Sequence, residues 1–586
     1  MSKNITQLFS PHSLRNRRIY PYLFFVFLIW VSRFLFVNSF GFYEDDWYFI
    51  GTAITNNFEQ NWSRLYNAYI TFFQGRPLYI TFVTVFPMLA EKLGGIKTLY
   101  SIGFLILSVN ACLLYKTLKK VINQPYMPFF ATLVFCFYPS DTTFTFLLHL
   151  FELQIAFLFI LVAFYLYFDS KKIICYIFAI CSLLTYETPF LTFLVAPFFL
   201  KENNKKKTIT HFIILASIAI VYLLVRKMLG ESTVVDLKIL STLQILIHQV
   251  IFGPLISFGM FFVRPWQVIF PFRLTNFLIL LFTLPILYLI ISLMTKKLFS
   301  QRSVEIKTQR LQEIKKILLI GSAMTILAYP IAITLDVNFT DGRASRVHFA
   351  AVFGIALIIS SLWSLILNQI PQKLIWKNIA VFLISLHISF LFVFCINVQH
   401  FYALSWKYQQ AFWSDVITLS PDLNQGTFVL VQAPNLQWGK QINPFDWSVP
   451  SVLGSIYDFP KDWKYPPRLY ILDSNTNNIE GWKSMIDKNN EFLLSNKNGS
   501  LRYYYDWEPE RKVDAKDIIL LVEENNQLVR KSFLELSNGN LISLKQKNDK
   551  IPLQKYKKSV LFNRLIDDTI RKKSNNRTAI YFESQH

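Results

Sequence analysis

The stretch from Tyr20 to Val37 reads YPYLFFVFLIWVSRFLFV, and it decides the class of this protein. A helix needs about 20 mostly apolar residues to cross the roughly 30 Å hydrocarbon core of a bilayer. The stretch follows a basic segment with Arg15, Arg17 and Arg18, lacks a small-residue cleavage site and precedes further apolar runs. We therefore interpret it as a retained transmembrane helix and not as a signal peptide that is removed.

The composition of the whole chain agrees with this interpretation. Hydrophobic residues make up 53% of 586 positions, aromatic residues 17% and charged residues 16%, which is more apolar surface than one soluble core can bury. The net charge of +22 comes largely from cations in short loops, where the positive-inside rule places them, so we expect no nucleic-acid partner. All five cysteines fall in apolar segments, which implies no disulfide framework and no C-x-x-C metal site.

Keeping the basic loops in the cytoplasm predicts about eleven crossings, with the N-terminus inside. The predicted spans lie near residues 19–39, 98–115, 126–139, 144–168, 173–186, 188–200, 208–225, 270–294, 317–334, 347–367 and 377–397. Two further apolar runs, 78–90 and 247–263, would reverse every later loop if they were crossings, so we predict interfacial or re-entrant pieces there. The fold expected is a polytopic α-helical membrane protein with about 11 to 13 transmembrane helices.

This count places several loops on one extracytoplasmic face: 40–76, 140–143, 226–246 and 335–346, together with everything after 398. The chain becomes polar from 398 and contains short β-type runs such as 428–431 and 518–522. We therefore predict a transmembrane domain over residues 1–397 that includes the first outer loop, and a soluble extracytoplasmic mixed α/β domain over 398–586. The expected location is the cytoplasmic membrane.

Three consecutive carboxylates follow the first span, in the sequence Glu44-Asp45-Asp46-Trp47. Crowded acids repel each other, so at least one should shift its pKa or share a cation. A carboxylate at the membrane surface can accept a proton from an acceptor hydroxyl or coordinate a metal that polarises a phosphate. The alternative is a solvated loop that simply follows a helix end.

Arginines at two outer turns are candidate phosphate ligands. Arg76 lies in Gln74-Gly75-Arg76-Pro77-Leu78, a turn at headgroup depth, where its guanidinium can bind a phosphate or reach lipid headgroups. The loop from Asp336 to Arg346 carries Arg343 and Arg346, and a bidentate guanidinium suits a lipid phosphate or diphosphate. The alternative for this loop is an exposed turn. Arg264, followed by Pro265 and Trp266, is a further candidate of the same type.

Three ionisable side chains are expected within or near membrane depth, where they are costly and often functional. His149 and Glu152 share one helix face at a spacing of three, so they could hold a metal or satisfy each other, and Glu187 lies at a helix break. The chain has no P-loop, no G-x-G-x-x-G and no H-E-x-x-H. Nothing local therefore supports a nucleotide-driven pump or a zinc protease.

The acidic pair after the first span, the juxtamembrane loop and the Arg76-Pro77-Leu78 turn together resemble the GT-C superfamily of polyprenyl-phosphate-sugar-dependent glycosyltransferases. Protein O-mannosyltransferases, the aminoarabinose transferase of lipid A and O-antigen-modifying transferases share this layout. The resemblance implies catalysis by a first-loop acid, here Asp45 or Asp46, and a second acidic site at Asp141. The turn lacks the family's second proline, and the arginine that often precedes the second acid is missing.

The function expected from this resemblance is inverting transfer of a sugar from a polyprenyl-phosphate carrier to an extracytoplasmic glycan, lipid or protein. A first-loop aspartate would be the general base, and Arg76, Arg343, Arg346 and Arg264 would hold the phosphate leaving group. Asp46 and Asp141 could bind a divalent metal ion. Two alternatives stay open: a transporter or flippase for a lipid-linked substrate, and a non-catalytic scaffold of the cell envelope.

Overall fold

A computed structural model describes most of the chain. The described residues are 19–124, 126–200, 204–229, 239–270, 272–296, 304–331, 337–339, 341–370, 373–432, 448–472, 491–494, 511–524, 527–535, 541–547 and 556–566.

The chain forms two compact units. Unit 1 comprises residues 1–37, 62–86 and 93–400, and unit 2 comprises residues 38–61, 87–92 and 401–586. Three helices contribute residues to both units: α4 (Phe58–Ile70), α5 (Pro77–Leu93) and α15 (Leu374–Leu419). The boundary that the sequence predicted between the two domains, at residue 398, falls inside α15, which is one continuous helix.

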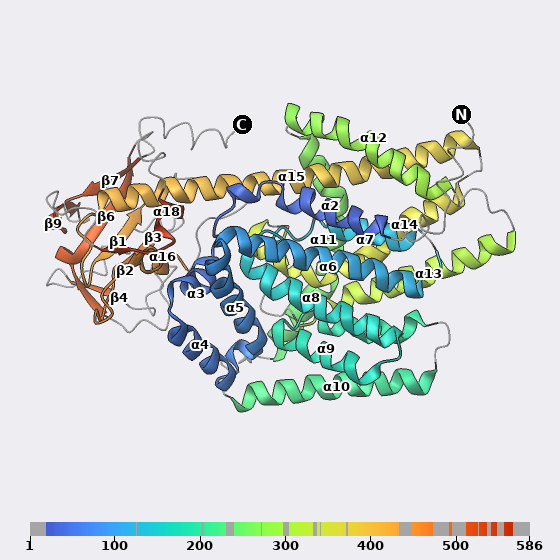
Figure 1. Cartoon of the computed structure of the whole chain (residues 1–586), viewed down its shortest axis with the longest axis horizontal. Helices are drawn as coiled ribbons and strands as arrows, with labels where there is room; N and C mark the ends of the chain where they lie inside the picture. The colour runs from blue at the N-terminus through green and yellow to red at the C-terminus, as the bar shows by residue number, and fades with distance from the viewer. Residues whose placement is uncertain are drawn as a thin grey trace. The chain divides into compact units, whose positions relative to one another are not determined.

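Unit 1 is helical (Figure 1). Besides parts of α4, α5 and α15, its described elements are α2 (Tyr20–Phe34), η4 (Phe73–Gly75), α6 (Ile96–Val121), α7 (Met127–Cys136), α8 (Leu147–Phe168), α9 (Lys172–Thr185), η5 (Phe190–Phe199), α10 (Lys205–Met228), α11 (Ile239–Ile269), α12 (Leu274–Lys296), α13 (Val304–Leu327), η7 (Gly342–Ala351) and α14 (Val352–Gln369). A short 3-10 turn, η2 (Val37–Ser39), bridges the two units in sequence.

Eight helices in the described residues are long and apolar enough to cross a membrane, which makes this a helical multi-pass membrane protein. The eight segments are Tyr20–Ser39, Ile96–Val121, Leu147–Phe168, Lys205–Met228, Leu243–Ile269, Leu274–Thr295, Gly342–Gln369 and Leu374–Leu419. Three predicted spans are shorter than a crossing requires, because α7, α9 and η5 contain only 10, 14 and 10 residues. Only residues 317–327 of the predicted span near 317–334 belong to α13, which begins earlier, among charged residues, and residues 332–334 lie outside the described part of the chain.

The structure of the apolar run 247–263 differs from the one that the sequence predicted. We expected a partial span, but α11 continues on both sides of this run and contains one of the eight long apolar segments. The helix accommodates Pro254 and Pro265 without ending. Because this segment is long enough to cross, the loop sides that were counted from the basic loops stay a prediction.

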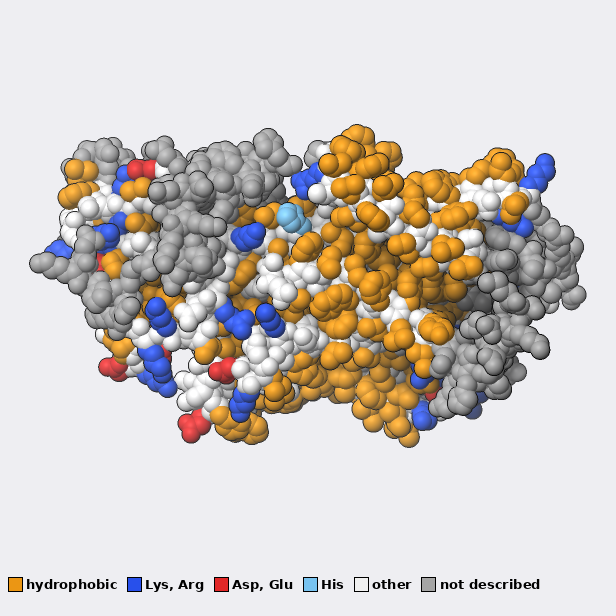
Figure 2. All heavy atoms as spheres, turned by 45° about the horizontal axis from the view of Figure 1, so that its top comes forward, with side chains coloured by type: hydrophobic (Ala, Val, Ile, Leu, Met, Phe, Trp, Pro, Cys, Tyr) orange, Lys and Arg blue, Asp and Glu red, His pale blue; other side chains and the backbone are white. Residues whose placement is uncertain are grey.

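Helices of unit 1 differ sharply in burial. In the most apolar window of α8, 83% of the residues are buried, compared with 11% in α12 and 17% in α10. Figure 2 shows hydrophobic side chains gathered over a wide area of the face in view. Soluble monomers rarely expose continuous apolar surface of this kind, which suits contact with lipid.

The interior of unit 1 depends on close helix packing. α13 and α14 pack against each other, as do α6 and α8, and α8 and α9. At the first of these contacts a Cβ atom on Gly354 would lie 2.7 Å from the carbonyl oxygen of Gly321. Only glycine lets the two backbones approach this closely.

Unit 2 contains a four-stranded mixed sheet of order β3-β1-β6-β7. β1 (Phe428–Gln432) pairs in parallel with β3 (Arg468–Leu472) and β6 (Ile518–Glu524), and β6 pairs antiparallel with β7 (Gln527–Lys531). The first four residues of β1 are buried, as a central strand requires. α16 (Val449–Ile456) packs on β3 and on the π-helical turn η3 (Trp47–Gly51), which α3 (Thr52–Thr55) continues.

The other described elements of unit 2 are small. They form three two-stranded ladders and two short helical pieces: β2 (Tyr457–Asp458) with β10 (Lys557–Lys558), β4 (Glu491–Leu494) with β5 (Arg511–Asp514), β8 (Phe533–Glu535) with β9 (Leu541–Ser543), η9 (Ala515–Asp517) and α18 (Phe562–Leu565).

Candidate functional site

Arg76 directly follows a tight turn that contains residues with left-handed backbone conformations. Phe72, Gln74 and Gly75 have φ values of 50°, 49° and 72°, so the chain reverses sharply between α4 and α5. A Cβ atom on Gly75 would lie 2.6 Å from the hydroxyl of Tyr222, so glycine satisfies both the positive φ and the close approach. The turn fixes the direction in which the Arg76 side chain leaves the backbone.

Two carboxylates grip the Arg76 guanidinium. Nε and Nη2 donate to Oε2 and Oε1 of Glu187 at 2.7 and 2.6 Å, and Nη1 donates to Oε1 of Glu152 at 2.9 Å. The guanidinium carbon lies 4.2 Å from the ring centroid of Tyr186. We call Arg76, Glu152, Tyr186 and Glu187 the Arg76 cluster. His149 and Glu152 were predicted to satisfy each other or a metal, whereas the structure joins Glu152 to Arg76.

Arg343 and Arg346 belong to the same electrostatic neighbourhood. Both lie on η7, are partly exposed, and exert their positive charge on His149. Tyr186 interacts electrostatically with both Arg346 and Arg76. His149 is only 2% exposed, and its Nδ1 has no hydrogen-bond partner among the described residues. Arg76 binds Glu152, and the charges of Arg343 and Arg346 act on His149, three residues earlier on α8, so three of the four arginines predicted to bind phosphate act on the same part of this helix.

Asp141 lies against the same segment of η7. Its Oδ1 accepts hydrogen bonds from the backbone N–H of Thr143 at 2.8 Å and from the Thr143 hydroxyl at 2.6 Å, and Ser345 Oγ lies 3.4 Å away. Next to it, Thr142 N–H donates to Ser345 Oγ at 2.9 Å, and Gly342 N–H donates to Thr142 Oγ1 at 2.8 Å. Two loops that were predicted to share one face therefore touch.

The carboxyl of Asp141 is buried and only half satisfied. Its Oδ2 has no hydrogen-bond partner among the described residues. Burial raises the pKa of Asp141 to about 6, although the hydrogen bonds from Thr143 oppose the shift. A carboxyl with this pKa changes its protonation state near neutral pH, which suits proton transfer.

Arg264 has a different environment from the other three arginines. Its Nη2 and Nη1 donate to the two carboxylate oxygens of Asp341 at 2.5 and 3.3 Å, and Nη1 also donates to Gln267 at 2.7 Å. Arg264 is 1% exposed, and its guanidinium lies 4.9 Å from the ring of Phe394. Burial raises the pKa of the Asp341 carboxyl, and Arg264 partly offsets this. The geometry indicates a bidentate ion pair that holds η7 to α11.

The acid cluster Glu44-Asp45-Asp46 is in unit 2 and is buried, with 4%, 4% and 0% of each residue exposed. The solvated loop considered above is therefore not what forms. Asp46 Oδ2 accepts a hydrogen bond from the backbone N–H of Tyr43 at 3.1 Å, and Glu44 has a left-handed φ of 42°. The Ser448 hydroxyl, directly before α16, donates to the carbonyl oxygen of Glu44.

A second set of bonds holds the acid cluster to α15. Trp47 Nε1 donates to Gln409 Oε1 at 2.9 Å, and Gln409 Nε2 donates to the carbonyl oxygen of Phe42 at 2.7 Å. The Tyr43 hydroxyl donates to the carbonyl oxygen of Tyr402 at 2.8 Å. Hydrogen bonds on both flanks thus position the backbone that carries the acids, as preorganised chemistry requires.

Metal binding receives no support from side-chain grouping. Among the residues that the structure describes, no three His, Cys, Asp or Glu side chains gather in a way that could hold a metal ion.

Sequence reasoning missed some members of these sites. Tyr186 and Ser345 carry no recognisable motif, and only their contacts with Arg76 and Asp141 mark them. The nearest available signal was the position of each residue one or two places from a residue already singled out.

Comparisons with protein families, with curated proteins and with solved structures find no match to this chain.

Proposed function

We propose that this chain is an inverting membrane glycosyltransferase that transfers a sugar from a polyprenyl-phosphate carrier to an acceptor outside the cytoplasmic membrane. The observation that carries the proposal is that Arg76 binds Glu152 of α8, while the charges of Arg343 and Arg346 act on His149, three residues earlier on the same helix. Positive charge at such a point stabilises the phosphate that departs when the glycosidic bond breaks. The N-terminus is cytoplasmic and the polar C-terminal unit extracytoplasmic in this proposal.

The chemical step is a single displacement. An acceptor hydroxyl oxygen forms the new bond to the anomeric carbon while the bond from that carbon to the phosphate oxygen breaks and its electron pair stays on the phosphate. Asp45, or its neighbour Asp46, takes the hydroxyl proton as general base. A single displacement inverts the anomeric centre. Lipid-facing helices such as α10 and α12 are suited to hold a protein beside a prenyl chain.

The carboxylate partners of Arg76 limit how many of its N–H groups can bind a phosphate. Arg76 already binds two carboxylates, so three of its five N–H donors are used. A phosphate at this point would therefore be shared between Arg76 and the two arginines of η7, which are partly exposed. Arg264 is assigned to its ion pair with Asp341 and not to the donor.

Reconstitution tests the proposal. The full chain in proteoliposomes is given polyprenyl-phosphate carriers of radiolabelled hexoses and pentoses together with envelope extract, and label transferred to the acceptor is measured. We expect Asp45→Asn to lower the transfer rate at least about 100-fold, because general base catalysis contributes about this much. Asp514→Asn is the matched control, since Asp514 is exposed and caps η9 with an oxygen that asparagine retains.

Other outcomes discriminate the alternatives. Movement of the labelled lipid across the bilayer without covalent change would favour a flippase. Equal transfer by Asp45→Asn, Asp46→Asn and Asp514→Asn would overturn the assignment of the base. Mass spectrometry of envelope glycans from cells with and without the chain then identifies the sugar and the acceptor.

A further inference from the structure

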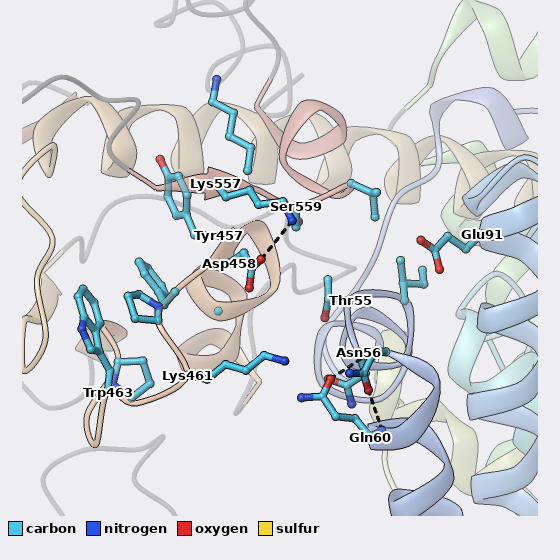
Figure 3. Close-up of a pocket in the computed structure, with 18 residues that line it drawn as sticks. Thr55, Asn56, Gln60, Glu91, Tyr457, Asp458, Lys461, Trp463, Lys557 and Ser559 are labelled. Atoms are coloured by element: carbon cyan, nitrogen blue, oxygen red, sulfur yellow. Dashed lines mark hydrogen bonds and ion pairs between the residues drawn. The ribbon is translucent and has the colours of Figure 1, made fainter.

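Unit 2 contains a cavity of about 570 Å³ that the sequence did not suggest (Figure 3). Residues of four segments line it: 54–60, where α3 ends and α4 begins; Glu91 of α5; 454–466, from the end of α16 onward; and 557–560 around β10. The volume is within the range of small-molecule sites. We call this space the lysine cavity, because Lys461, Lys557 and Lys558 are among its lining residues.

One wall of the cavity is aromatic. Phe459 and Trp463 stack with ring centroids 5.7 Å apart and planes at 18°, and Tyr556 packs edge-on against both. Trp463 is partly exposed and lines the cavity with Tyr457 and Phe459. Aromatic faces that are fixed by neighbours offer a flat apolar surface for a ring-shaped ligand at little entropic cost.

Amide groups line the opposite side. Asn57 and Gln60 cap each other's backbone, since Gln60 Oε1 accepts from Asn57 N–H at 3.0 Å and Asn57 Oδ1 accepts from Gln60 N–H at 2.9 Å. Their carbonyl ends are thus occupied, while their NH₂ ends donate to no residue in the described part of the chain. Asn56 and Thr55 add further polar groups beside them (Figure 3). Such groups can serve several hydroxyls of one ligand.

The charged groups of the cavity are exposed and loosely held. Lys557 Nζ lies 3.5 Å from Asp458 Oδ2, and these two side chains are 82% and 52% exposed. Lys461 extends across the cavity toward Asn56 and Gln60 (Figure 3). Among the described residues that line the cavity, the three lysines exceed the two carboxylates, Asp458 and Glu91, so their net charge is positive. An anionic group on the ligand would satisfy this charge.

We propose that the lysine cavity binds an acidic glycan, whose sugar rings contact the aromatic wall and whose carboxylate or phosphate contacts the lysines. This inference rests on the proposed function, because it names the acceptor class. α16 supports it: Ser448 at the start of the helix bonds to Glu44, and Gly454 near its end lines the cavity. Eight helical residues span about 12 Å, so one acceptor chain can reach from the cavity toward Asp45.

Binding measurements on the full chain in nanodiscs test the inference. The probes are a galacturonate hexamer, a mannohexaose phosphorylated at one end, and neutral maltohexaose as the uncharged reference. We expect one of the two acidic probes to bind at least about tenfold more tightly than maltohexaose, and less tightly as salt rises. The carboxylate and phosphate arms identify the acidic group. Equal binding of acidic and neutral probes, or no binding, would overturn the inference.

Variants locate the binding. We expect Lys461→Gln to weaken binding of the acidic probe about tenfold, because a charge-assisted hydrogen bond is lost. Lys407→Gln is the matched control, since Lys407 is an exposed lysine on α15 in the same unit and does not line the cavity. Trp463→Phe should retain more affinity than Trp463→Ala, which keeps the test valid if the alanine variant folds poorly. Equal Kd values for Lys461→Gln and Lys407→Gln would overturn the assignment.

Asp45→Asn separates this inference from the proposed function. We expect this variant to keep the preference for the acidic probe over maltohexaose while its transfer rate falls at least about 100-fold. A wild-type chain that transfers sugar but shows no preference for an acidic probe overturns the cavity assignment alone. A chain that binds the acidic probe but transfers nothing overturns the glycosyltransferase proposal alone.

Discussion

The Arg76 cluster and the lysine cavity both gather charged and aromatic side chains, but they hold their charges in opposite ways. In the Arg76 cluster, three hydrogen bonds of 2.6 to 2.9 Å join one arginine to two nearly buried carboxylates. In the lysine cavity, the ion pair between Lys557 and Asp458 is 3.5 Å long and largely exposed. The buried carboxylates tie Arg76 into the fold and leave only part of its guanidinium for a ligand, whereas the lysine-cavity charges are held weakly and stay exposed.

Of the changes that test this contrast, removing the Arg76 charge should lower the free energy of unfolding the most. We expect Arg76→Gln to lower the free energy of unfolding by about 3 to 5 kcal/mol, because Glu152 and Glu187 would then be buried without a counter-charge. Thermal unfolding in detergent, followed by tryptophan fluorescence, measures the change. The control is Lys97→Gln, which removes an exposed positive charge at the start of α6.

Arg76→Lys adds a second test of the same point. Lysine keeps the charge but cannot reproduce the bidentate contact with Glu187, so this variant should fall between wild type and Arg76→Gln. Equal stability of all four proteins would mean that the buried pairing contributes nothing, and the contrast between the two sites would not hold.

A smaller effect is expected from Asp141, and it should depend on pH. The pKa of this carboxyl is about 6 in the folded protein against an ordinary 3.8, so folding favours the neutral form. The stabilisation is fully present below pH 3.8 and is lost as the pH rises through 6, by about 3 kcal/mol in total. Relative to wild type, Asp141→Asn should therefore gain stability between pH 4 and pH 7.

Unfolding curves at a series of pH values measure this difference. The control is Asp514→Asn, which replaces an exposed aspartate by a residue that retains the oxygen that caps η9. A stability difference between Asp141→Asn and wild type that stays constant from pH 4 to pH 7 would contradict the raised pKa.

The smallest change in the free energy of unfolding is expected at the exposed ion pair of the lysine cavity. Lys557→Ala and Asp458→Ala should each change the free energy of unfolding by at most about 1 kcal/mol, because exposed ion pairs contribute little. A double-mutant cycle measures the coupling between the two side chains. A coupling as large as that between Arg76 and Glu187 would show that the cavity charges are structural, and it would weaken the case for a ligand there.

Helices α8 and α12 show how far the sequence could be followed into the fold. Both are long, mostly apolar helices, and the sequence predicted spans at both, near 144–168 and 270–294. Their overall hydrophobicity does not distinguish the helix that is mostly buried from the helix that is mostly exposed; only His149, Glu152 and Gln154 mark α8 as different. Lipid tails are as apolar as a protein core, so the same residues suit both surroundings.

The candidate sites show a similar limit. The sequence picked out Arg76, Arg264, Arg343 and Arg346 by residue type and by their position at outer turns. It could not tell that Arg264 is paired with Asp341, 77 residues away, or that Arg76 binds Glu187, 111 residues away. The lysine cavity was not foreseen at all, because its lining comes from four separated segments.

The amino-acid sequence by itself determined that this chain enters a membrane, since long apolar runs have no other favourable solvent, and it marked the segments that carry the charge. Only the tertiary structure decided which apolar helices form the interior, which arginine and carboxylate partners meet, and where a cavity opens. The physical reason is that these properties depend on residues at different separations along the chain. Hydrophobicity acts residue by residue along the chain, whereas ion pairing and cavity shape depend on distances between segments that the local pattern does not encode.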